Sequence, residues 1–109
     1  AVKRVIMNKW IPTTNISELR VLGKAAEESS ELSTVLARCI IQGINESEPV
    51  TGKPNRRWLE EEIADVMATL SVVMEEFDLD HDFIIERTIV KVGRLEIWKE
   101  LLKDDTNGK

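Results

Sequence analysis

The chain is poor in the residues that form disulfides and zinc sites, and it has no long apolar run. With one cysteine and one histidine in 109 residues, it cannot form an internal disulfide, and a zinc site built from Cys and His ligands is disfavoured. No apolar run approaches the roughly 20 residues that span a bilayer, and the first residues lack the pattern of a signal peptide. We therefore expect a cytoplasmic protein without a membrane partner.

Prolines, glycines and excess positive charge are also scarce. Three prolines and five glycines leave long uninterrupted segments, so disorder is expected only near the ends. The net charge of −5 argues against a general nucleic-acid binder, which presents a basic face. The length is that of one domain, and we predict a single domain, 1–109.

Three long segments free of proline predict helices. They lie at about 15–43, 56–77 and 82–103. No segment shows a sustained alternation of apolar and polar residues, so we expect no substantial sheet and an all-α fold. The remaining segments are an N-terminal arm, a proline-containing loop and a flexible tail: 1–14, 44–55 and 104–109.

Residues that favour helix ends mark the boundaries of these segments. Asn15 or Ser17 is expected to cap the first helix, and Gly43 is expected to end it. Asn55 is expected to cap the second helix. His81 is expected to lie at the start of the third helix rather than to bind a metal.

The predicted helices are longer than one small globule can cover. The first spans about 40 Å at 1.5 Å per residue, whereas a compact chain of this length has a radius of gyration of about 13 Å. The third helix carries apolar residues on two nearly opposite faces, which indicates neighbours on both. These faces contain Ile84, Thr88, Val92 and Leu95, and Val90, Ile97 and Leu101. We therefore expect a homo-oligomeric helical bundle.

One acidic phrase occurs in two of the predicted helices, as EESSEL and then as EEIADV. At about 100° per residue, Glu28 of the first phrase and Glu62 of the second each fall inside an apolar stripe. The neighbours of Glu28 in its stripe are Val21, Leu32, Val35 and Cys39. The neighbours of Glu62 are Leu59, Val66, Thr69, Val73 and Phe77. The two helices therefore present equivalent acids on the faces that are expected to be buried.

Two further acids lie on the shoulders of these stripes. Glu31 and Asp65 are each about 60° from the buried acid of their own helix, whereas Glu27 is about 100° from Glu28 and is expected to be solvated. Four carboxylates that converge between two helices repel one another, and burial of an unpaired charge is costly. A divalent cation with oxygen ligands satisfies them, which predicts Mg²⁺, or Mn²⁺ in its place.

Two other interpretations of these acids are weaker. Acids one turn apart are common on solvated helix faces, but that does not explain two matched pairs that are each centred on an apolar stripe. A di-iron carboxylate bundle needs Glu-x-x-His motifs. The chain has no such motif, because its one histidine lies in the turn before the third helix.

With these two motifs, the chain resembles the all-α nucleoside triphosphate pyrophosphohydrolases of the MazG type. This family is similar to all-α dUTPases, dCTP pyrophosphatases and phosphoribosyl-ATP pyrophosphohydrolase. The matching residues are Glu28, Glu31, Glu62 and Asp65. The resemblance implies that they hold Mg²⁺ and act as catalytic groups in cleaving a nucleoside triphosphate, ribo or deoxy, between its α and β phosphates, which gives a monophosphate and pyrophosphate. It also implies house-cleaning of the nucleotide pool and a homodimer or homotetramer.

Basic and aromatic residues are candidates for contacts with the nucleotide. Lys91 and Arg94 lie on the third predicted helix, where the resemblance favours basic residues, and are candidate phosphate contacts. Surface ion pairing is their alternative role. Trp58 lies one turn before Glu62, and Trp10 lies on the N-terminal arm. Either ring is a candidate platform for the base, although packing is the simpler role for both.

Two alternative functions stay open. The same fold and chemistry could act on phosphoribosyl-ATP. The chain could instead be a non-catalytic helical interaction module in which the acids form a degenerate site. Activity on deoxynucleoside triphosphates separates the nucleoside triphosphate pyrophosphohydrolase from both alternatives.

Overall fold

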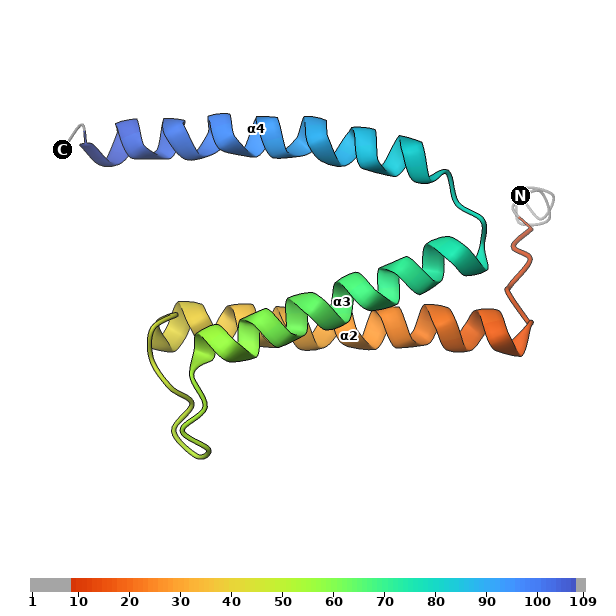
Figure 1. The fold of residues 1–109 in the computed structure, drawn as a ribbon, viewed down its shortest axis with the longest axis horizontal. Helices are drawn as coiled ribbons and strands as arrows, with labels where there is room; N and C mark the ends of the chain where they lie inside the picture. The colour runs from red at the N-terminus through yellow and green to blue at the C-terminus, as the bar shows by residue number, and fades with distance from the viewer. Residues whose placement is uncertain (1–8, 108–109) are drawn as a thin grey trace, which may run out of the picture. The chain divides into compact units, whose positions relative to one another are not determined.

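Three long helices make up most of the described chain. The structure, a computed structural model, describes residues 9–107. The helices are α2 (Ile16–Gln42), α3 (Asn55–Glu76) and α4 (His81–Asn107) (Figure 1). Within the described residues there is no strand, only an isolated bridge between Ser47 and Pro54. The all-α prediction is confirmed.

The tertiary contacts divide the chain into two compact units. The first, Ala1–Phe77, contains α2 and α3, and the second, Asp78–Lys109, contains α4. Within the first unit, α2 and α3 pack against each other as an antiparallel hairpin (Figure 1). Of the helices in the described part of the chain, none is both long and apolar enough to span a bilayer.

Both ends of α2 follow the predicted signals. The Asn15 side chain accepts a hydrogen bond from the Glu18 N–H at 3.0 Å, so Asn15 rather than Ser17 is the cap. At the other end, Gly43 adopts a φ of 108°, in the positive region that favours glycine. Its N–H donates to the Cys39 carbonyl at 2.9 Å. The helix between these two residues is 27 residues long, close to the length predicted from the sequence.

The start of α3 differs from its prediction. Asn55 does not cap the helix, because α3 already begins at Asn55 and the residue before it is Pro54. The Asn55 side chain is 0% exposed and donates to the Gln42 side chain at 3.1 Å and to the Gly43 carbonyl at 3.0 Å. Asn55 therefore joins the end of α2 to the start of α3, a tertiary role that competes successfully with local capping.

The loop between α2 and α3 satisfies its own polar groups. The Glu48 carboxylate accepts hydrogen bonds from the Val50 N–H at 2.9 Å and from the Thr51 N–H and hydroxyl, each at 2.7 Å. The backbone closes the loop through three bonds, from the Glu48 N–H to the Lys53 carbonyl at 2.9 Å, from the Gly52 N–H to the Glu48 carbonyl at 2.8 Å and from the Asn55 N–H to the Glu46 carbonyl at 2.9 Å. This loop is therefore an ordered element that fixes how the two helices are joined.

The third helix starts where it was predicted to start but ends later. α4 begins at His81, as predicted, and the Asp80 side chain accepts a hydrogen bond from the Phe83 N–H at 3.0 Å. It continues to Asn107, beyond its predicted end at about 103, and the residues after Asn107 lie outside the described part of the chain. Polar residues extend a helix that is already formed, because propagation costs much less than nucleation.

The packed face of the hairpin is the one that the apolar stripes predict. Ala25, Val35 and Glu28 of α2 are buried. The other stripe residues are all half-buried: Val21, Leu32, Cys39, Leu59, Val66, Thr69, Val73 and Phe77. On α4, by contrast, the described side chains are exposed except for Ile84, which is half-buried.

Candidate metal centre

Three carboxylates from the two helices of the hairpin converge. Glu28 comes from α2, and Glu62 and Asp65 come from α3. Each offers one carboxylate oxygen, and these oxygens all lie within 4.8 Å of one another. Glu28 is only 8% exposed, Glu62 is half-buried and Asp65 is exposed. The site is therefore closed at Glu28 and opens toward solvent at Asp65.

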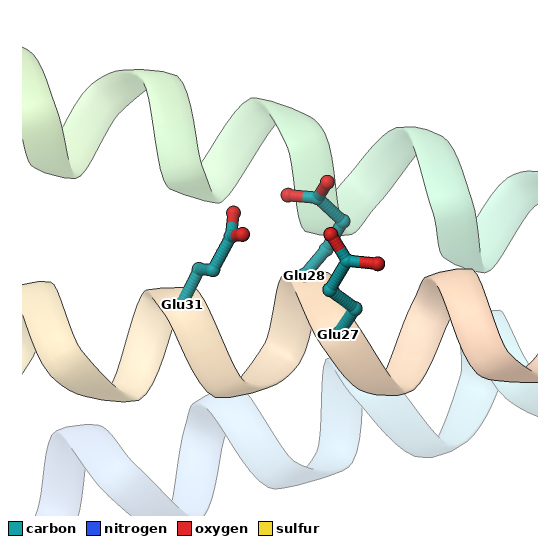
Figure 2. Close-up of side chains that lie close together, drawn as sticks. All are labelled: Glu27, Glu28 and Glu31. Atoms are coloured by element: carbon teal, nitrogen blue, oxygen red, sulfur yellow. The ribbon is translucent and has the colours of Figure 1, made fainter.

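A second group of acids shares Glu28 and lies along α2. Oxygens of Glu27, Glu28 and Glu31 also lie within 4.8 Å of one another. Figure 2 shows that Glu28 and Glu31 extend from α2 toward the ribbon of α3. The four residues predicted as metal ligands are thus divided between two overlapping groups, and Glu28 belongs to both.

Glu27 is a member of this second group that sequence reasoning missed. It is exposed, as expected for its angle on the helix. Its carboxylate nevertheless reaches the group, where Lys24 Nζ lies 3.5 Å from Glu27 Oε1 and 3.3 Å from Glu28 Oε1. A long glutamate side chain can cover the angular distance that the helical wheel assigns to its Cα. The only signal in the sequence is that Glu27 directly precedes Glu28.

Two carboxylate oxygens at the centre of the hairpin have no internal partner. Within the described residues, the Oε2 atoms of Glu28 and Glu62 are buried and lack a hydrogen-bond donor. An unsatisfied buried acceptor destabilises the fold, so such atoms are rare in native proteins. A bound cation would satisfy both. The donor set consists of hard carboxylate oxygens, which fits Mg²⁺ or Mn²⁺ and does not fit a soft metal.

The electrostatics of the cluster also favour a cation. The pKa of Glu31 is raised, first by the negative charge of Glu28 and then by partial burial and by Glu62. The pKa of Glu62 is raised, first by burial and then by the charges of Asp65 and Glu28. Like charges contribute to both pKa shifts, because carboxylates that are close together disfavour one another's ionised form. A divalent cation at this position would reverse both effects.

Lys24 provides part of the positive charge that the cluster needs. The pKa of Lys24 is raised, first by its hydrogen bond to Glu28 and then by the charge of Glu27. It pairs with Oε1 of Glu28, whereas Oε2 of Glu28 is buried and has no partner among the described residues. A single exposed ammonium group therefore does not replace a cation between the helices.

The two tryptophans proposed as base platforms lie in different surroundings. Trp10 is 89% exposed, on the segment that precedes α2. Trp58 is half-buried on α3, one turn before Glu62. Lys53 Nζ lies 3.9 Å from the centroid of the Trp58 ring, so a cation already occupies one position over this ring. The proposed stacking roles of both tryptophans stay predictions.

Lys91 and Arg94, the candidate phosphate contacts, lie on α4 in the unit Asp78–Lys109. Both are exposed. They line a shallow hollow along α4 together with Phe83, Glu86, Arg87 and Val90. A hollow on one helix cannot enclose a ligand by itself, so their role as phosphate contacts stays a prediction.

Arg38 is a further charged residue on α2 that sequence reasoning missed. It lies on α2, two turns after Glu31, and its guanidinium Cζ is 5.5 Å from the centroid of the Trp58 ring. The helical period places Arg38 on the same face as Glu31, within about 20°. The sequence therefore contained its angular position, but its contact with Trp58 depends on how α2 and α3 pair.

Comparison of the chain with protein-family models, with curated proteins and with solved structures finds no match. The features that indicate a function are therefore the geometry of the acids and the two motifs EESSEL and EEIADV.

Proposed function

We propose that the protein is a Mg²⁺-dependent nucleotide pyrophosphohydrolase that converts a nucleoside triphosphate, ribo or deoxy, to the monophosphate and pyrophosphate. The observation that carries the metal part of the proposal is the convergence of Glu28, Glu62 and Asp65 within 4.8 Å, with two buried oxygens that lack a donor. The resemblance to MazG-type enzymes supplies the reaction and the position of cleavage. House-cleaning of the nucleotide pool is the role that this chemistry suggests.

The surroundings of each acid in the cluster suggest whether it would bind the metal or activate water. Glu28, Glu62 and Asp65 would hold the cation, because their oxygens meet between α2 and α3. Bound Mg²⁺ would polarise phosphate oxygens and lower the pKa of a water molecule. Glu31 is exposed and lies beside Glu28 but outside the group formed by Glu28, Glu62 and Asp65, so its carboxylate would be free to orient that water and accept its proton.

We place this activity in a homodimer or homotetramer, with the helices assembled as a homo-oligomeric bundle. Up to residue 103, α4 exposes apolar side chains that are costly to leave in water. These include Phe83, Ile89, Val92, Ile97, Trp98 and Leu101. Size-exclusion chromatography with light scattering tests this assignment. A monomer across the micromolar range would contradict it.

The first experiment is incubation with Mg²⁺ and a panel of NTPs and dNTPs, with the products separated by ion exchange. We expect monophosphate and pyrophosphate, no product in excess EDTA, and no product from the Glu62→Gln variant. Glu60→Gln is the matched control, because Glu60 is exposed on the same helix, where it lies near Arg57.

The products distinguish the remaining hypotheses. A nucleoside diphosphate and orthophosphate would show that the metal site is active but that the position of cleavage is wrong. If no NTP or dNTP is hydrolysed, phosphoribosyl-ATP is the next substrate to test. If that compound is also inert, the activity is refuted and the non-catalytic interaction module is favoured.

A further inference from the structure

Two cationic side chains surround one aromatic ring near the loop end of the hairpin. Lys53 Nζ lies 3.9 Å and Arg38 Cζ lies 5.5 Å from the centroid of the Trp58 ring. The three residues come from the loop, from α2 and from α3 respectively. A cation over an aromatic face is stabilised by the ring's quadrupole, so the ring can hold both charges in place.

This group contains hydrogen-bond donors that have no acceptor. Among the described residues, Arg38 Nη1 and Trp58 Nε1 are both buried and lack a hydrogen-bond partner. An indole N–H is a donor whose hydrogen is fixed in the plane of the ring. A guanidinium group keeps its charge at any relevant pH. Two unsatisfied donors on neighbouring side chains therefore indicate a missing acceptor, and the positive charge of Arg38 indicates that the acceptor is an anion.

The nearby carboxylates do not supply this acceptor. Glu61 forms an ion pair with Lys53. Glu48 lies close enough to Arg38 for their charges to interact, but its two oxygens already accept bonds from Val50 and Thr51. The Glu48 carboxylate therefore bonds within the loop, and Arg38 Nη1 has no acceptor among the described residues.

Arg38 and Trp58 lie within one or two helical turns of the acids on their own helices. Along α2, Arg38 follows Glu31 by two turns, or about 10 Å. Along α3, Trp58 precedes Glu62 by one turn, or about 6 Å. Arg38 and Glu31 also share a face of α2. These spacings are comparable to the length of a polyphosphate chain, so one ligand could contact both groups.

We propose that Arg38 and Trp58 form an anion subsite that donates hydrogen bonds to a phosphate group, with Lys53 adding positive charge. In the enzyme, this subsite binds one phosphate of the polyphosphate chain whose other phosphates meet the metal at Glu28 and Glu62. That second step depends on the proposed function, whereas the binding of an anion does not. Trp58 then acts as a donor and as a support for two cations, instead of as a stacking platform for the base.

Metal-free binding of inorganic pyrophosphate tests the subsite directly. Isothermal titration in excess EDTA and low salt is expected to detect binding to the wild-type chain, weakened about tenfold or more in Arg38→Met because a charge-assisted hydrogen bond is lost. Arg57→Met is the matched control, because Arg57 is exposed and lies near Glu60. No binding to the wild type, or equal weakening in both variants, would overturn the subsite.

Two conservative variants keep the test valid if Arg38→Met unfolds the hairpin. Trp58→Phe retains an aromatic ring for Lys53 and Arg38 but removes the indole N–H, and Arg38→Lys retains the charge but removes the planar fork. Both are expected to weaken pyrophosphate binding while circular dichroism shows unchanged helix content. If a folded Trp58→Phe variant binds as tightly as the wild type, the donor role of Trp58 is refuted.

The kinetics separate failure of the subsite from failure of the proposed function. With Mg²⁺ and a nucleotide substrate, Arg38→Met is expected to raise KM with little change in kcat, as for loss of uniform binding. Nucleotide turnover with an unchanged KM would reject the subsite and keep the enzyme. Arg38-dependent binding of pyrophosphate without turnover of any nucleotide would keep the subsite and reject the enzyme.

Discussion

The glutamate of the loop and the glutamates of the acid cluster differ in whether their carboxylate oxygens have hydrogen-bond donors. In the loop, the oxygens of Glu48 accept bonds from the Val50 N–H and from the N–H and hydroxyl of Thr51. In the cluster, Glu28 and Glu62 each have a buried oxygen for which the described chain offers no donor. The loop carboxylate has its hydrogen bonds from neighbouring residues, whereas the cluster carboxylates lack donors that the described part of the chain does not provide.

The pKa shifts follow this difference. The pKa of Glu48 is lowered, first by the Val50 N–H and then by the donors of Thr51. The pKa of Glu62 is raised, first by burial and then by Asp65 and Glu28. Hydrogen bonds stabilise the ionised form, while burial and like charges destabilise it. A carboxylate that stabilises the fold thus has hydrogen-bond donors within the chain and a lowered pKa, whereas one available for a ligand lacks such donors and has a raised pKa.

The largest difference between the two regions is expected when Glu28 and Glu48 are neutralised in separate variants. Glu28→Gln is expected to lower kcat/KM for the nucleotide by about 1,000-fold or more, because a metal ligand supports several kcal/mol of charge stabilisation. Glu48→Gln is expected to retain turnover once the protein is folded. Steady-state assays at saturating Mg²⁺ measure both. Comparable losses in the two variants would show that the distinction between the two regions has no functional meaning.

The second largest effect is expected in the response to Mg²⁺. A ligand that binds only the native state stabilises it by about 2.7 kcal/mol at 100 times its Kd. We therefore expect Mg²⁺ to raise the melting temperature of the wild-type chain and of Glu48→Gln, but not that of Glu28→Gln. Differential scanning fluorimetry with and without EDTA measures the shift. An equal shift in all three proteins would place the binding of Mg²⁺ outside the cluster.

Much of this comparison could be predicted from the sequence because it follows from helical angles. The period of α2 and α3 fixes the direction of each Cα–Cβ bond, so the buried position of Glu28 and the shoulder position of Glu31 follow from spacing alone. The stripes also predict that the acids face the other helix, whereas their alignment along the hairpin depends on how α2 and α3 pair.

Other features could not be predicted because they depend on contacts between elements. Asn55 was expected to cap α3, but it bonds to the end of α2 instead. The contact between Arg38 and Trp58 needs the pairing of the two helices, which no local pattern fixes. Glu27 reaches the cluster through a long flexible side chain, whose conformation an angular projection does not describe.

A third and smaller effect concerns stability in the absence of metal. Glu48→Gln is expected to lower the melting temperature by a few degrees, because the amide is a weaker acceptor for the Thr51 donors than the carboxylate. Glu28→Gln in EDTA is expected to leave the melting temperature unchanged or to raise it, because burial of an amide costs less than burial of a charge. Circular dichroism melts test this, and Thr51→Ser, which keeps the hydroxyl donor, is the control. A large loss of stability in Glu28→Gln would indicate a structural role for its charge.

The smallest expected effect is a difference in the pH dependence of stability. For Glu62, the folded pKa lies above its ordinary value of 4.5, so the native state retains a proton that the unfolded state has lost. Its destabilising contribution is therefore absent below pH 4.5, appears as the pH rises from that value and is complete above the folded pKa. Glu48 has the opposite sign, since its stabilising contribution is present above 4.5 and is lost as the pH falls through its lowered folded pKa.

Urea unfolding in EDTA at a series of pH values measures the two contributions. Relative to the wild type, Glu62→Gln is expected to become more stable as the pH rises above 4.5. Glu48→Gln is expected to become less stable than the wild type as the pH rises through the lowered folded pKa of Glu48. Mg²⁺ should bind more tightly over the same rise in pH, because its ligands must be deprotonated. If both variants follow the wild-type profile, the carboxylates of the loop and of the cluster are equally satisfied by the chain, and the argument for a cation between α2 and α3 fails.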